Sequence, residues 1–142
     1  MNGKPLIMVA DDNSKNIRII KECLDGAVEV RSAKDGLSLL QALEELSKEN
    51  TYPDVLIIDY FMPRADGLEA IKALRQNKKY QNLPTLVLTQ RGDIEAQISS
   101  VTNGFDLFLA KPINSVLLKQ HIKVMLELAK GRKNQEIVPR KE

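Results

Sequence analysis

Five short apolar runs recur along the chain, and a segment with helical spacing of apolar residues follows each one. The runs are residues 5–10, 28–33, 54–59, 83–89 and 107–110. The central run, Val55 to Ile58, lies between Pro53 and Pro63, is too short for an ordinary helix and is typical of a strand buried on both faces of a parallel sheet. Because strands that alternate with helices form βαβ units, the pattern predicts an α/β fold: a five-stranded parallel sheet with helices on both faces.

The apolar spacing places five helices between and after these strands. We expect them at about 15–25, 36–46, 68–74, 93–103 and 115–130. Ser14 is expected to cap the first helix. The second should bury the leucines that recur at intervals of three, Leu37, Leu40, Leu43 and Leu46.

The last predicted helix has an unusually wide apolar arc. Its members are Leu117, Leu118, Ile122, Val124, Met125, Leu126, Leu128 and Ala129. Two interpretations stay open: a helix wedged deeply against its neighbours, or a helix with an exposed apolar patch for partner docking or dimerisation. Residues 1–130 are expected to form one domain, and residues 131–142 a C-terminal tail or linker stub.

Composition excludes several classes of protein. Of the 142 residues, 43% are hydrophobic and 28% are charged, which is the balance of a soluble globular domain. The net charge of +2 gives no argument for direct nucleic-acid binding. No apolar run approaches the roughly 20 residues that a membrane span needs, and no signal peptide is apparent. The expected compartment is the cytoplasm, and the single cysteine, Cys23, excludes an internal disulfide.

Polar groups stand where four of the five predicted strands end. They are Asp11, Asp12, Asp59, Thr89 and Lys111. Because the carboxyl ends of parallel strands meet at one edge of the sheet, where ligands bind in open α/β folds, these groups should converge. Three crowded carboxylates repel one another, and a divalent cation such as Mg²⁺ would relieve that repulsion. With an ammonium and a hydroxyl beside them, the set predicts a phosphoryl-transfer site.

These residues give the chain a family resemblance. Over about residues 5–130 it resembles a response-regulator receiver domain of two-component signalling, which implies a doubly wound (βα)₅ flavodoxin-like fold. The resemblance is carried by Asp11-Asp12, Asp59 with Met62-Pro63 and Gly67, Thr89, Phe108 and Lys111-Pro112.

The resemblance implies a role for each site residue. Asp59 would be the phosphoacceptor and would take a phosphoryl group from a sensor histidine kinase or a phosphotransfer protein. Mg²⁺ would be the cofactor, bound by Asp12, Asp59 and the backbone carbonyl of Phe61, with Asp11 acting mainly through water. Such a chain is a signalling domain that catalyses only its own phosphorylation and dephosphorylation.

Three further residues complete the implied machinery. Lys111 would contact the phosphoryl group, next to a cis Lys111-Pro112 bond, and Thr89 would swing toward that group. Phe108 would turn inward behind Thr89 as the aromatic part of the switch. The state would be relayed through the face formed by the fourth helix, the fifth strand and the fifth helix, to a second copy or a downstream protein.

Three positions shape the expectations for the site. Gln90 follows Thr89, where the family usually has a small residue. Phe61 and Arg91 flank the path by which water would reach an acyl phosphate, so we expect slow intrinsic dephosphorylation. An equal rate of phosphate loss in a Phe61→Ala, Arg91→Ala double variant would refute that expectation.

Two alternative functions are weighed beside the phosphorylated receiver. One is a pseudo-receiver that keeps the fold as an interaction module without phosphorylation. The other is a Mg²⁺-dependent aspartyl phosphatase, which usually needs a second carboxylate two residues after the nucleophile, where this chain has Phe61. No output domain follows the last helix in this sequence, so we expect a stand-alone receiver or the N-terminal part of a longer regulator.

Overall fold

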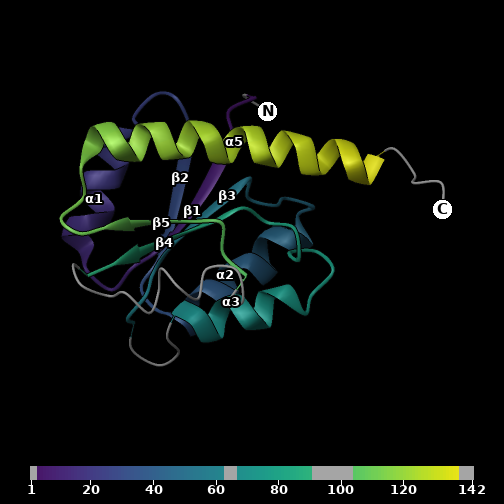
Figure 1. The fold of residues 1–142 in the computed structure, drawn as a ribbon. Helices are drawn as coiled ribbons and strands as arrows, with labels where there is room; N and C mark the ends of the chain where they lie inside the picture. The colour runs from purple at the N-terminus through teal and green to yellow at the C-terminus, as the bar shows by residue number, and fades with distance from the viewer. Residues whose placement is uncertain (1–2, 63–66, 91–103, 138–142) are drawn as a thin grey trace.

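The chain folds into a parallel sheet with helices on both faces (Figure 1). The computed structural model describes residues 3–62, 67–90 and 104–137. Five strands form one sheet in the order β2-β1-β3-β4-β5, and every neighbouring pair is parallel. The strands are β1 (Leu6–Ala10), β2 (Glu29–Ala33), β3 (Val55–Asp59), β4 (Thr85–Thr89) and β5 (Leu107–Ala110). The predicted α/β class and five-stranded sheet are therefore confirmed.

Four helices in the described ranges cover the two faces of the sheet. They are α1 (Ser14–Cys23), α2 (Gly36–Lys48), α3 (Gly67–Arg75) and α5 (Ser115–Ile137). Helices α1 and α5 lie on one face, and α2 and α3 lie on the other (Figure 1). The expected helix at 93–103 falls outside the described residues. Within the described ranges, no helix combines the length and apolar character that a membrane crossing requires.

The central strands supply both halves of the core because alternate side chains point to opposite faces. In β1, Ile7 and Val9 pack toward α1 and α5, whereas Met8 and Ala10 pack toward α2 and α3. Every residue of β1, β3 and β4 is buried. Unbroken apolar runs are therefore needed in these strands, as the sequence predicts.

Two details of the predicted helices are wrong. Asn13, not Ser14, caps α1: its side-chain oxygen accepts the Lys15 N–H at 2.9 Å. In α2 the buried leucines include Leu39, and Leu37 is 42% exposed. The reason is geometric, because nine residues at about 100° each put Leu37 and Leu46 on opposite sides of the helix.

Helix α5 buries one part of its apolar arc and exposes another, and a docking role for the exposed part stays a prediction. Leu118, Ile122, Met125 and Ala129 are buried against the sheet, while Leu117 and Val124 are exposed, as is Val116 before them. The helix continues to Ile137, seven residues beyond the expected end at 130. The domain boundary itself stays a prediction.

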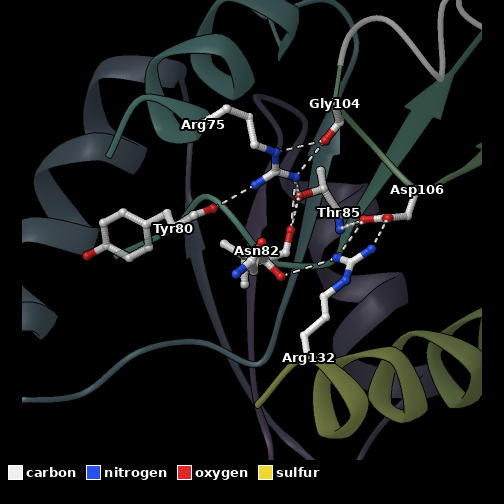
Figure 2. A network of polar contacts seen from close by, with 8 residues as sticks. Arg75, Tyr80, Asn82, Thr85, Gly104, Asp106 and Arg132 are labelled. Atoms are coloured by element: carbon white, nitrogen blue, oxygen red, sulfur yellow. Dashed lines mark hydrogen bonds and ion pairs between the residues drawn. The ribbon is translucent and has the colours of Figure 1, made fainter. Parts of the chain in front are cut away.

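Two arginines make hydrogen bonds and an ion pair at the end of the sheet where the strands begin, opposite their carboxyl ends (Figure 2). Arg75, at the end of α3, donates hydrogen bonds to the carbonyls of Gly104, Tyr80 and Leu83 and to Thr85 Oγ1. This guanidinium therefore joins α3 and the start of β4 to the backbone that precedes β5.

The second arginine, Arg132, comes from the part of α5 beyond its expected end. Its Nη2 lies 2.5 Å from Asp106 Oδ1, and Asp106 Oδ2 accepts the Thr85 N–H at 2.9 Å. Both contacts are drawn in Figure 2. The extension of α5 is thus held to the residues that open β4 and precede β5.

Candidate functional site

The carboxyl ends of four strands bring the predicted polar groups to one edge of the sheet. Ala10 pairs with Ile58, Asp59 pairs with Leu88, and Thr89 pairs with Ala110. The residues that end or directly follow these strands are Asp11, Asp12, Asp59, Thr89 and Lys111. Their convergence follows from the parallel register and matches the prediction.

Three carboxylates form a tight cluster at this edge. Asp11, Asp12 and Asp59 each offer an oxygen, and these oxygens lie within 4.8 Å of one another. Asp11 and Asp59 are buried, whereas Asp12 is exposed. The cluster therefore has two fixed, desolvated members and one that faces solvent.

The first turn of α1 holds the Asp11 carboxylate. The Asn13 N–H donates to Asp11 Oδ1 at 2.9 Å, and Asn16 Nδ2 donates to Oδ2 at 3.2 Å. The contribution of Asn16 was not predicted, since an Asn in a helical pattern carries no sequence signal for such a contact.

Lys111 supplies the positive charge of the site. Its Nζ lies 3.0 Å from Asp59 Oδ2 and 3.8 Å from Asp11 Oδ2. Its backbone N–H donates to the Thr89 carbonyl at 2.7 Å, and the Lys111-Pro112 peptide bond is cis. The ammonium is therefore anchored between the two buried carboxylates.

The surroundings raise the pKa of Asp59 above the usual aspartate value. Burial is the largest cause, and the charge of Asp11 adds to it, whereas Lys111 and the Phe61 N–H act in the opposite direction. In the protein alone, the contact with Lys111 therefore does not fully offset the burial of the Asp59 carboxylate and its repulsion by Asp11.

The donor set fits a magnesium ion. Three carboxylates and one ammonium leave two negative charges, and the oxygens are close enough to share one cation. Mg²⁺ prefers such oxygen ligands and keeps several waters, for which the exposed side of Asp12 leaves room.

A hollow of about 570 Å³ opens over the cluster. The described residues that line it are Asp12, Asn13, Ser14, Asp59, Phe61, Gln90 and Lys111. Phe61 is 57% exposed. The centroids of its ring and of the Tyr60 ring lie 4.6 Å apart, in an edge-on arrangement. Arg91, the other expected shield, lies outside the described residues. Gln90 stands at the hollow, as its position after Thr89 suggested.

The two predicted switch residues lie beside the site. Thr89 is buried at the end of β4 and is not among the described residues that line the hollow. Phe108 is half-buried in β5, opposite Val87, and packs against the core beneath α2 and α3. Phe108 therefore lies between the interior and the surface on β5. Strand β5 pairs with β4, which in turn pairs with β3, the strand of Asp59.

Gly67 touches the backbone of the central aspartate. A Cβ atom at Gly67 would lie 2.4 Å from the Asp59 carbonyl oxygen, and the Gly67 N–H donates to the Tyr60 carbonyl at 3.1 Å. Such close approach admits only glycine. The start of α3 thereby fixes the backbone on which Asp59 stands.

Comparison with known proteins agrees with this geometry. Residues 7–123 match the family model of the response regulator receiver domain. The chain belongs to this family. It is 33% identical over 127 residues to a chemotaxis protein CheY homolog of Campylobacter jejuni, an alignment that covers 88% of this chain and 95% of the relative.

Other receiver domains give the same result. Chemotaxis response regulator CheY4 of Vibrio cholerae has a TM-score of 0.75 at 27% identity, over 87% of this chain and 99% of that one. Hybrid signal transduction histidine kinase D of Dictyostelium discoideum is 28% identical over 132 residues, which are 93% of this chain but 8% of that protein. The chain is therefore a receiver domain of two-component signalling with a flavodoxin-like fold.

Proposed function

We propose that this receiver domain accepts a phosphoryl group on Asp59 from a sensor histidine kinase or a phosphotransfer protein. The observation that carries the proposal is the position of the Asp59 carboxylate, at a strand tip inside an acidic cluster and 3.0 Å from Lys111 Nζ. The hollow above the cluster gives a donor access to Asp59.

The transfer requires only in-line displacement at phosphorus. A carboxylate oxygen of Asp59 attacks the phosphorus of a phosphohistidine, so that an O–P bond forms as the N–P bond breaks. The electron pair of the broken bond stays on the imidazole nitrogen, which leaves. Lys111 pairs with the oxygens of the phosphoryl group as it arrives, and its short contact with Asp59 keeps the ammonium aimed at this point.

Asp12, Asp59 and the carbonyl of Phe61 would hold Mg²⁺, with Asp11 acting mainly through water. When bound, the ion neutralises charge on the carboxylates and on the phosphoryl oxygens. Burial and the charge of Asp11 raise the pKa of Asp59 and so disfavour its ionised form, and a bound cation would act in the opposite direction.

Phosphorylation would then act through Thr89 and Phe108. The added charge and acceptor oxygens favour the loop arrangement that satisfies them. Thr89 ends β4, the strand that pairs with the strand of Asp59, and Phe108 is half-buried on the next strand, β5. The partner surface would include β5 and the exposed Leu117 and Val124 of α5, and would take a second copy or a downstream protein in the cytoplasm.

The test is the intact mass of the protein after incubation with Mg²⁺ and acetyl phosphate or phosphoramidate. We expect wild type to gain one phosphoryl group, and Asp59→Asn, or wild type in EDTA, to gain none. No gain with several donors, in protein shown to be folded by circular dichroism, would favour a pseudo-receiver over a phosphorylated one.

A further inference from the structure

The Asp11 carboxylate is oriented before any metal arrives. It is fully buried, and both of its oxygens accept hydrogen bonds from the first turn of α1. The bond to Oδ1 comes from the Asn13 backbone, which no substitution of a side chain removes. The bond to Oδ2 comes from the Asn16 side chain and therefore depends on which residue occupies position 16.

Asp11 Oδ2 lies between two groups that compete for it. Asn16 Nδ2 is 3.2 Å away, at hydrogen-bond distance, whereas Lys111 Nζ is 3.8 Å away, just beyond that distance. A charge-assisted bond to an ammonium is stronger than one to an amide. Without the Asn16 amide, a small rotation of the Asp11 carboxylate would bring Oδ2 to Lys111.

That rotation would harm the site in two ways. It would change the orientation of one carboxylate of the cluster, and it would draw the ammonium away from Asp59, which it contacts at 3.0 Å. An amide prevents both changes without adding charge, so it does not increase the repulsion within the cluster. Outer groups that support a metal site typically contribute about ten- to a hundredfold to metal affinity, and we expect Asn16 to act near the lower end because Asp11 would reach the metal mainly through water.

We infer that Asn16 is a positioning residue of the Mg²⁺ site, and that its amide holds Asp11 toward the metal and leaves Lys111 to Asp59. The inference rests on the proposed function, because it takes the carboxylate cluster as the Mg²⁺ site. Asn16 contacts neither the phosphoryl group nor the metal in this account.

The test is Mg²⁺ binding to the unphosphorylated protein, measured by isothermal titration calorimetry. Asn16→Leu keeps the size of the side chain and removes the donor, and Asn16→Ala serves if the leucine variant fails to fold. Asn77→Leu is the control: the Asn77 side chain likewise makes a hydrogen bond near a helix end, accepting the Lys79 N–H at 2.9 Å, but it is exposed and lies in the α3–β4 loop. We expect Kd to rise about tenfold for Asn16→Leu and to stay within twofold for Asn77→Leu.

Melting in EDTA separates positioning from a merely structural role. A lower melting temperature of Asn16→Leu with Kd within twofold of wild type would overturn the inference. If wild type itself bound no Mg²⁺ at millimolar concentrations, the metal site of the proposed function would fail first. The two failures are therefore distinguishable.

Discussion

Lys111 Nζ lies 3.0 Å from Asp59 Oδ2 and 3.8 Å from Oδ2 of a second buried carboxylate, Asp11. One ammonium thus faces two desolvated carboxylates, and the pKa of Asp59 is still raised. The metal-free site is therefore short of positive charge. This imbalance would favour binding of a divalent cation.

Without metal, the raised pKa of Asp59 should make stability depend on pH. A carboxyl with a folded-state pKa above its unfolded value contributes stability below the unfolded pKa and loses it as pH rises through the folded pKa. We expect the free energy of unfolding of wild type minus that of Asp59→Asn to fall as pH rises above about 4. Urea denaturation in EDTA across this range measures it. A difference that does not change with pH would contradict the assigned cause.

Removal of the Lys111 ammonium should slow phosphorylation strongly while the protein stays folded. We expect Lys111→Met to lower the rate of phosphorylation by acetyl phosphate at least about a hundredfold, as for loss of one preorganised charge at a reacting group. Lys79→Met, at an exposed lysine in the α3–β4 loop, is the control and should keep the wild-type rate. Equal rates in the two variants would remove Lys111 from the proposed machinery.

Gly67 and Gly131 should respond oppositely to alanine. A Cβ at Gly67 would lie 2.4 Å from the Asp59 carbonyl oxygen, whereas one at Gly131 meets nothing within 4 Å. We expect Gly67→Ala to destabilise the protein by about 1–3 kcal/mol, and Gly131→Ala, inside α5, to stabilise it by up to about 1 kcal/mol. Urea denaturation of both variants gives the comparison. If Gly131→Ala destabilised the protein and Gly67→Ala did not, the close approach at Gly67 would be misassigned.

The Arg132–Asp106 ion pair should keep the end of α5 folded onto the domain. Both side chains are partly buried, so we expect Arg132→Gln to destabilise the protein by about 1 kcal/mol and to raise amide hydrogen exchange in residues 131–137. Lys130→Gln, at an exposed neighbour, should change neither quantity. Unchanged exchange in Arg132→Gln would mean that packing alone holds this part of the helix.

The fold and the site outline could be predicted from sequence because both depend on simple periodicity. Unbroken apolar runs identify β1, β3 and β4, and parallel strands necessarily bring their carboxyl-end residues to one edge. Asp11, Asp59 and Lys111 were found for this reason. Their meeting at one edge of the sheet does not depend on how individual side chains pack.

The details that escaped prediction depend on rotation and on long-range contacts. Asn13 and Ser14 are both good caps, so only backbone geometry decides between them. Leu37 is on the wrong side of α2 because an interval of three drifts around the helix. The length of α5 depends partly on Arg132 reaching Asp106, a contact between residues far apart in the chain.

The identity of the phosphoacceptor is the claim to test first. Wild-type protein would be phosphorylated with acetyl phosphate and Mg²⁺, reduced with borohydride to convert the acyl phosphate to an alcohol, digested and mapped by tandem mass spectrometry. We expect the reduced residue at position 59 and nowhere else, with the signal lost in EDTA. Reduction at Asp11 or Asp12 in place of Asp59, or no reduced residue in folded protein, would contradict the assignment.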